Sequence, residues 1–326
     1  MQDHNDHVEP AAWSEYWDDG ARGAAQALGN AGLADQLNEF WADVFRPVFQ
    51  NASTPIRLLD AACGTGIVAS TASRTAQTAS FKNLEIYLTD YAPGAVSAAL
   101  QKPDLMMACG FVADAQKFPV DEGVFDLVVS QFGLEYAGME GFGSAMDAVA
   151  RGGSLHCVSH IKGGEIEREC AQNLGVLETA QSSKLLKQFI ALFLAIHAGR
   201  PERQVAGLAR KATKASADVQ KALHLAKPGG ARDHVARLLN DMQRIMNNIR
   251  NFVPSDIEAW VAGQADSLEA YRIRMHSMVM AALDEEAIAQ LADEFEQRDF
   301  VDIGVKPMVN QRGQSRIAWI VSARRK

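Results

Sequence analysis

The chain has 326 residues, of which 48% are hydrophobic and 22% are charged, and its formal net charge is −8. This composition is that of an ordinary globular chain with one large or two moderate domains, and no internal repeat or low-complexity tract is present. The acidic balance speaks against a protein that coats nucleic acid with its whole surface, although a local basic surface stays compatible with it.

Cysteine usage and hydropathy argue against metal-binding, disulfide-rich, secreted and membrane-spanning classes of protein. The cysteines, Cys63, Cys109, Cys157 and Cys170, have neither the paired spacing of metal ligands nor the density of a disulfide scaffold, so we expect them to be reduced and mostly buried. The N-terminal residues show no basic segment followed by an apolar run, and the apolar stretch 189–196 is too short to span a bilayer. These features predict a cytoplasmic protein.

Periodicity predicts an α/β core in the first half of the chain. Apolar residues at three- and four-residue steps between Leu37 and Val48 predict an amphipathic helix. Short β-rich runs then alternate with helical segments, at residues 56–60, 84–90, 110–113, 125–130 and 154–159. This alternation predicts right-handed crossovers and a parallel sheet. Turns are expected before the last two runs, at 121–123 and 151–153.

The strand pattern stops after His160, and residues 164–283 contain many helix formers without a convincing strand. The apolar run 189–196 should end at Gly199 and Pro201. Residues 200–250 are basic, with eleven Lys or Arg against four acids, and Pro228-Gly229-Gly230 divides them. An acid-rich helix is expected over 284–297, before two runs at 300–306 and 316–323 that would complete the sheet as an antiparallel pair.

The segment 58–66, Leu-Leu-Asp-Ala-Ala-Cys-Gly-Thr-Gly, joins an apolar strand to a glycine turn. Gly64 and Gly66 leave the backbone bare, so that amides at the start of the following helix can face a ligand. With Ala69 they also satisfy the loose dinucleotide pattern. The carboxylate of Asp60, however, would face a pyrophosphate unfavourably, whereas it suits the cationic ammonium and sulfonium of S-adenosylmethionine (SAM). The segment therefore favours SAM as the cofactor.

Residues 56–160 resemble the core of class I SAM-dependent methyltransferases, especially the small-molecule group that contains the ubiquinone and menaquinone biosynthesis C-methyltransferases. The family usually has Gly where Ala62 stands. The motifs that agree in order are the glycine segment, Asp90-Tyr91, Asp114-Ala115, the run 125–134 and the turn at 151–155. The resemblance implies an α/β fold with a Rossmann-like sheet, mostly parallel with an antiparallel last strand, plus N-terminal helices and a helical insertion.

The resemblance also implies cofactor contacts. Asp90 should hold both ribose hydroxyls, which one carboxylate at a strand end can accept. Asp114 should bond the adenine amino group while Tyr91 and Phe132 cover the ring, and backbone around Gln131 should receive the methionine end. Helix N-capping is the alternative role for both acids. The full set of expected cofactor-binding residues is Asp60, Ala62, Gly64, Gly66, Asp90, Tyr91, Asp114, Ala115, Gln131, Phe132, Trp13, Tyr16 and Trp17.

The three N-terminal aromatics in that set have helical spacing, and in related enzymes a leading helix closes over bound SAM. Their faces would attract the sulfonium cation. Plain packing is the alternative. The expected domains are a helical lid at 1–50, the SAM-binding core at 51–163, a helical insertion at 164–283, and a helix with the last strands at 284–326. The insertion is either a substrate-binding cap or lid, or a homodimer contact.

Methyl transfer from a sulfonium is an in-line displacement with a good leaving group, so the protein mainly aligns the partners and excludes water. A base is needed only if the nucleophile loses its proton early. His160 is the candidate base or substrate anchor, and a structural histidine is the alternative. Glu135 and Tyr136 are expected to line the same cavity. We see no clustered oxygen ligands for a metal.

The sequence thus predicts a SAM-dependent methyltransferase that acts on a small molecule. An alternative is an enzyme or binding module directed at RNA or protein through the basic residues 200–250. Nucleic acid is disfavoured, because that segment contains no Phe, Tyr or Trp for stacking. In addition, Ser130-Gln131-Phe132-Gly133 stands where amino-directed nucleic-acid methyltransferases carry an Asn/Asp-Pro-Pro-aromatic tetrad. An NAD-linked oxidoreductase is a third possibility.

Overall fold

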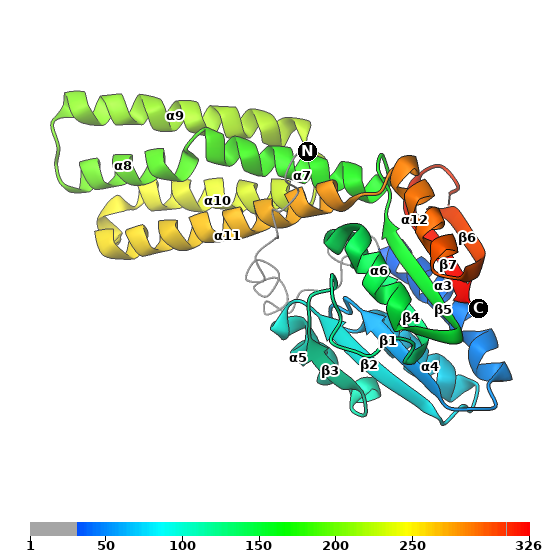
Figure 1. The fold of residues 1–326 in the computed structure, drawn as a ribbon. Coiled ribbons are helices and arrows are strands. Elements are labelled where there is room, and N and C mark those ends of the chain that lie inside the picture. Colours follow the sequence, from blue (N-terminus) through cyan, green and yellow to red (C-terminus); the bar gives the residue numbers. More distant parts are fainter. Residues whose placement is uncertain (1–30, 311) are drawn as a thin grey trace. The chain divides into compact units, whose positions relative to one another are not determined.

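The computed structural model describes residues 31–310 and 312–326. Trp13, Tyr16 and Trp17 lie outside the described residues. By its internal packing the chain divides into two compact units, one formed by residues up to Arg168 with Ser277–Lys326, the other by Glu169–His276. The first unit contains the sheet and the second is helical (Figure 1).

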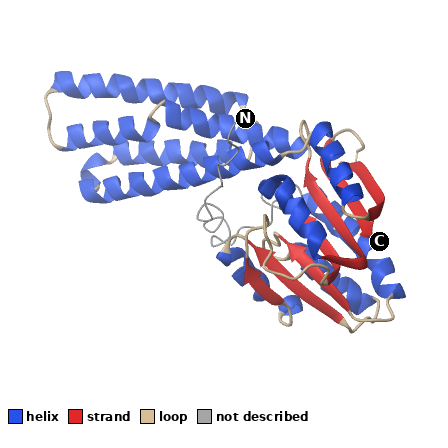
Figure 2. Cartoon of the chain, viewed as in Figure 1, coloured by secondary structure: helices blue, strands red, loops and turns tan. Residues whose placement is uncertain are grey.

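The first unit is built on a seven-stranded sheet in the described part of the chain (Figure 2). Its strands are β1 (Ile56–Ala61), β2 (Leu84–Asp90), β3 (Cys109–Val112), β4 (Phe125–Gln131), β5 (Val149–His160), β6 (Phe300–Val309) and β7 (Arg316–Arg325). The order is β3-β2-β1-β4-β5-β7-β6. Strands β1 to β5 are parallel, and β7 runs antiparallel to both β5 and β6. The predicted Rossmann-like sheet with an antiparallel last strand is confirmed.

Helices cover both faces of this sheet. They are α3 (Ala31–Asn51), α4 (Ile67–Thr78), α5 (Pro93–Leu100) and α6 (Gly138–Ala148), the short turns η1 (Pro103–Leu105) and η2 (Leu134–Ala137), and α12 (Glu285–Gln297). Successive strand residues point to opposite faces. Leu59 therefore joins a core with Phe142 of α6 and Phe295 of α12, whereas Asp60 faces α4 and bonds Ala69 there.

One predicted boundary is wrong. Residues 151–153 were expected to form a turn before the fifth strand, but β5 already begins at Val149 and includes them. The physical reason is an irregularity in the pairing with β4, where the register shifts between Phe125 and Leu127. Gly152 adopts a φ of 78° there. A Cβ on Gly153 would lie 2.8 Å from the carbonyl oxygen of Asp126, so close backbone packing requires this glycine inside the strand.

The second unit is a helical bundle, as the helix formers of this region predicted. Its helices are α8 (Leu185–His197), α9 (Glu202–Leu225), α10 (Gly230–Asn247) and the turn η3 (Ile249–Asn251), together with most of α7 (Glu165–Ser182) and α11 (Pro254–Ala281). Helix α8 ends before Gly199 and Pro201, as expected. Inside the bundle the ring of Phe189 packs on that of Trp260, with 6.0 Å between ring centroids.

A buried amide joins two helices of this unit. Oδ1 of Asn173 in α7 accepts a hydrogen bond from the backbone N–H of Ala231, at 3.0 Å. The N–H groups of a first helical turn have no partner within their own helix. The Asn173 side chain therefore caps α10 and ties it to α7. Within the described residues, no helix is both long and apolar enough to cross a membrane.

Candidate cofactor and acceptor site

Parallel strands bring their carboxyl ends to one edge of the sheet, and the predicted site residues lie at or just beyond these ends. Asp60 is the penultimate residue of β1, and Asp90 ends the neighbouring β2. Gln131 ends β4 and His160 ends the adjacent β5. The strand order thus places all four residues along the edge where ligands bind in open α/β sheets.

The turn after β1 has an unusual backbone. Ala62, Gly64 and Gly66 have φ values of 54°, 51° and 69°, all in the left-handed region. This region costs a residue with a Cβ about 1–2 kcal/mol, so Ala62 holds a backbone conformation that glycine would adopt without strain. A Cβ on Gly66 would also lie 2.8 Å from Cδ1 of Leu105. The turn therefore requires glycine where it meets η1.

Asp60 is buried under this turn, with 1% of its surface exposed. Its Oδ2 accepts a hydrogen bond from the backbone N–H of Ala69 at 3.0 Å, while Oδ1 has no partner in the described part of the chain. The pKa of Asp60 is raised to about 8, because burial and, less strongly, the charge of Asp90 outweigh the lowering effects of the Ala69 hydrogen bond and of Lys102. This carboxyl oxygen is thus an unpaired buried polar atom beside the glycine turn.

Asp90 holds the same turn from the second strand. Its Oδ2 accepts from the N–H of Gly64 at 2.8 Å, and its Oδ1 accepts from the N–H of Ala92 at 2.9 Å. Burial raises the pKa of this carboxyl, and the hydrogen bonds from Ala92 and Gly64 lower it. A carboxylate has about four lone-pair positions. Both oxygens therefore retain capacity for ribose hydroxyls while they shape the turn.

The residues expected around the adenine are more open. Tyr91 is 37% exposed, directly after Asp90. Asp114 lies just beyond β3, and its Oδ1 accepts from the backbone N–H of Gln116 at 2.9 Å. Ala115 is half-buried. The adenine contacts of these side chains stay predictions. The bond of Asp114 to Gln116 closes a local turn after β3.

Gln131 has a partner that sequence reasoning missed. Its Oε1 accepts from the indole N–H of Trp41, at 2.7 Å. Trp41 is fully buried in α3, in a row of stacked rings with Phe45. The helix ahead of β1 is therefore tied to the end of β4, next to the predicted position of the methionine end. Only the apolar position of Trp41 in its helix could have pointed to it.

Glu135 and His160 form a buried pair. Oε1 of Glu135 accepts from both the backbone N–H and Nδ1 of His160, at 2.9 and 2.7 Å. The ring of Phe132 lies 4.5 Å from that of His160 and the ring of Tyr136 lies 5.8 Å from it, measured between centroids. The structure thus brings together the three predicted catalytic candidates. Phe132 belongs to the same group, and its predicted contact with adenine is untested.

The residues present fit SAM on their own chemistry. The glycine turn exposes backbone at the start of α4, Asp60 offers an orphaned buried oxygen, and Asp90 offers acceptors at the neighbouring strand end. The two carboxyl groups at the turn favour a cation over a pyrophosphate, although Lys102 is near enough to act on the pKa of Asp60. Cys63 plays no such part, because burial raises the pKa of its thiol well above the ordinary value.

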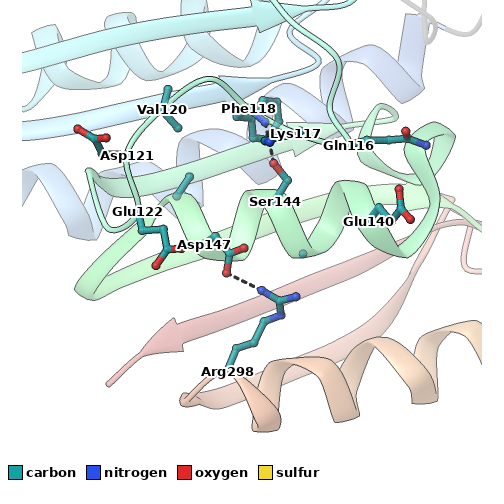
Figure 3. Close-up of a pocket in the computed structure, with 12 residues that line it drawn as sticks. Gln116, Lys117, Phe118, Val120, Asp121, Glu122, Glu140, Ser144, Asp147 and Arg298 are labelled. Carbon is teal, nitrogen blue, oxygen red and sulfur yellow. Dashed lines mark hydrogen bonds and ion pairs between the residues drawn. The ribbon is translucent and has the colours of Figure 1, made fainter.

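A hollow in the surface lies apart from these residues. It has a volume of about 370 Å³ and is lined by the segment 116–122, α6 and Arg298. Figure 3 shows the ion pair between Arg298 and Asp147 at its wall, and the bond from the N–H of Phe118 to Ser144. None of the predicted cofactor or catalytic residues lines it. Among the described residues, no cluster of three or more His, Cys, Asp or Glu side chains could hold a metal ion.

Comparison with protein families decides the class of the core. Residues 58–153 match the family described as "Methyltransferase domain". These residues form a class I SAM-dependent methyltransferase domain. SAM is the cofactor of this domain, and methyl transfer is its chemistry. The NAD-linked alternative is thereby set aside, while the finer relation to the ubiquinone group is an expectation only.

Solved structures similar to the chain include the plantazolicin methyltransferase BpumL in complex with SAH. It is 9% identical, the match covers 97% of this chain and 95% of that chain, and the TM-score is 0.48. The methyltransferase in complex with the Haloferax volcanii Trm112 activator is 16% identical over 48% and 63%, with a TM-score of 0.33. Geranyl diphosphate methyltransferase is 14% identical over 39% and 45%, also with a TM-score of 0.33.

This chain thus spans less than two thirds of the last two solved chains that it matches. No curated protein matches the sequence. The substrates and partners of the proteins in these comparisons are properties of those proteins, and the acceptor for this methyltransferase domain has to be argued from its own residues.

Proposed function

We propose that the protein transfers the methyl group of SAM to a small-molecule acceptor. The observation that carries the proposal is the meeting, at one sheet edge, of two different kinds of group. The ends of β1 and β2 carry the glycine turn with Asp60 and Asp90, which suit the cofactor. The ends of β4 and β5 carry Glu135 and His160, surrounded by aromatic rings, which suit an acceptor.

Several features support a small acceptor. His160 and Glu135 are almost fully buried, and the rings of Phe132 and Tyr136 surround the imidazole. Such enclosure favours a compact molecule over a polymer and excludes water from the reacting atoms. In this proposal the cofactor supplies an activated methyl group. The protein's own side chains bind the two partners, align them and keep the site dry.

We further propose that the helical unit contributes to acceptor selection as a cap. It is inserted directly after β5, whose carboxyl end carries His160. Connections at this edge of open sheets commonly build the ligand site. A homodimer contact through the insertion is the other role we propose to test. The buried Phe189 and Phe193 of α8 already pack inside the unit, so that contact would have to use its outer residues.

The experiment that tests the function is a screen of candidate acceptors for release of S-adenosylhomocysteine by the full chain, paired with calorimetry of SAM binding. Asp90→Ala should weaken SAM binding tenfold or more, because it removes the acceptor for ribose and loosens the Gly64 turn. Asp43→Ala is the matched control, since Asp43 is exposed on α3. Unchanged SAM affinity in Asp90→Ala would remove the ribose assignment.

One observation favours the alternative, an RNA- or protein-directed methyltransferase. Arg203, Arg210, Lys214 and Lys221 of α9 are exposed, and their spacing places them on one side of the helix. A nucleic-acid substrate held by such cations should lose affinity steeply as salt is raised. If neither duplex nor single-stranded RNA binds at low salt, an RNA substrate is excluded; a protein substrate would then have to be tested separately by assaying methyl transfer to candidate proteins.

A further inference from the structure

Glu135 and His160 are joined by two hydrogen bonds at one oxygen. The backbone N–H of His160 donates to Oε1 of Glu135. Nδ1 of the same ring lies 2.7 Å from that oxygen, and with Glu135 as the carboxylate, which only accepts, the hydrogen is on Nδ1. In the neutral ring, Nε2 is then left with a free lone pair. The carboxylate thus sets the imidazole in the form that can accept a proton.

Nε2 of His160 lacks a hydrogen-bond partner in the described residues, and so does Oε2 of Glu135 in the same pair. His160 is 1% exposed. A buried polar atom left without a hydrogen bond costs about 1–3 kcal/mol, so buried ring nitrogens are normally paired. This vacancy is unexplained by the fold, because Nδ1 alone holds the ring. It points to a donor group that is supplied by a bound molecule.

The imidazole of His160 has two aromatic neighbours. Phe132 has a φ of 55°, in the left-handed region, and its N–H donates to the carbonyl of Val158 at 2.7 Å. This strained backbone carries the ring that lies against the imidazole, while Tyr136 meets the imidazole at an interplanar angle of 81°. Strain of this kind is typical of functional sites. The two rings suit a planar apolar body attached to the donor.

We propose that Glu135 and His160 act as a general base for a hydroxyl group on a planar apolar acceptor, so that the product is a methyl ether. This inference rests on the proposed methyl transfer and names its acceptor atom. A neutral hydroxyl offers Nε2 the missing donor and brings no charge into the buried site. An ammonium acceptor would add a second cation beside the sulfonium, which like-charge repulsion disfavours.

In the proposed step one carbon–oxygen bond forms, one carbon–sulfur bond breaks and one proton moves to His160. The acceptor oxygen gives an electron pair to the methyl carbon, and its proton passes to Nε2 of His160. The electron pair of the broken carbon–sulfur bond stays on sulfur, which becomes neutral. The imidazolium is stabilised by the Glu135 carboxylate until it releases the proton to solvent. His160 is the catalytic residue in this scheme, and Glu135 is a positioning residue that sets the ring form.

The test uses phenols of graded acidity as acceptors for the full chain. His160→Gln should lower kcat/KM by about 10²-fold or more for phenol and 4-methoxyphenol, which is the usual contribution of a general base. The same variant should lose little with 4-nitrophenol, which is largely ionised at mildly alkaline pH and needs no base. His156→Gln is the matched control, because His156 lies on the same strand and bonds Ser154.

The possible results distinguish failure of the general-base inference from failure of the proposed methyl transfer. Equal losses for all phenols would assign His160 a structural role and overturn the inference. So would transfer only to amines or carbon acceptors by a protein that binds SAM. Failure of the proposed function itself would look different: no acceptor of any class would yield S-adenosylhomocysteine.

A spectroscopic measurement does not depend on a folded variant or on turnover. In protein labelled with ¹⁵N-histidine, His160 of the free wild type should show a protonated Nδ1 and an unprotonated Nε2. Glu135→Gln should reduce the preference for this form, because a neutral amide oxygen is a weaker partner for Nδ1–H than a carboxylate. A ring protonated at Nε2 in the wild-type protein would contradict the proposed base.

Discussion

Binding of SAM should release a proton from Asp60. In the free protein the pKa of this carboxyl is raised to about 8, mainly by burial and also by the charge of Asp90, against the opposing effects of the Ala69 hydrogen bond and of Lys102. A group with that pKa is about nine-tenths protonated at pH 7. A sulfonium or ammonium bound beside the glycine turn would stabilise the carboxylate and lower its pKa. The cation can bind tightly only once the proton has left.

The magnitude follows from this titration. We expect about 0.9 proton released for each SAM bound at pH 7, about 0.5 at pH 8 and about 0.1 at pH 9. The Kd for SAM should fall by up to about tenfold for each pH unit between pH 6 and 8, and level off above. Calorimetry in two buffers of different ionisation enthalpy, such as phosphate and Tris, measures the released proton directly.

Asp60→Asn provides the decisive comparison. The amide resembles the protonated acid and can still accept from the N–H of Ala69, but it has no proton to release. Its SAM binding should be weaker and independent of pH, whereas Asp43→Asn, on the exposed face of α3, should behave as the wild type. Equal heats in both buffers with the wild-type protein at pH 7 would refute the reasoning, because Asp60 would then already be ionised or lie away from the cation.

The same pKa has a consequence for stability. Asp60 titrates near 3.8 when unfolded and near 8 when folded. Between these values the native state binds more protons than the unfolded state, so the contribution of Asp60 is present at low pH and is lost as pH rises from about 4 to 8. At 1.36 kcal/mol for each pKa unit the full loss is on the order of several kcal/mol. Asp60→Asn should therefore be more stable than the wild type at pH 8 and similar to it at pH 4, in urea denaturation.

Two further predictions concern packing. Gly133→Ala should lower the free energy of unfolding by about 1–3 kcal/mol, because the new Cβ would lie 2.3 Å from Cβ of Ala62. Adding Ala62→Gly should restore most of the lost stability. A double variant as unstable as the single one would show that the clash is elsewhere. Asn173→Ala should cost about 1 kcal/mol by removing the cap of α10, with Asn247→Ala at the opposite end of α10 as the control; equal urea midpoints for the two variants would argue against the cap.

The sheet could be predicted from the sequence because its signals are local. Apolar runs such as those of β2 and β4 are bounded by turn residues, and their alternation with helices leaves few topologies. The turn expected at 151–153 was wrong because its glycines serve a tertiary purpose. Gly153 packs against the carbonyl of Asp126 in the neighbouring strand, a contact that no local pattern expresses.

The site could be predicted as a list of strand ends but not as a set of bonds. Adjacent parallel strands made it reasonable to expect Glu135 near His160, yet only the structure shows one oxygen that accepts two hydrogens from the same residue. The bond from Trp41 to Gln131 joins residues far apart in the chain. Helical periodicity marks Trp41 as apolar and buried, and it carries no information about the partner of the indole N–H.

The left-handed backbone after two strands shows how tertiary contacts override local conformational preference. Ala62 follows β1 and Phe132 follows β4, and both carry side chains in a conformation that favours glycine. Neither alanine nor phenylalanine favours this conformation without support from the surrounding structure. Ala62 is set by the hydrogen bonds of Asp90 and Thr89 to the neighbouring residues of the turn, and Phe132 by its bond to Val158. The sheet therefore bears the strain, which places bare amides on one side of the edge and an aromatic ring beside His160 on the other.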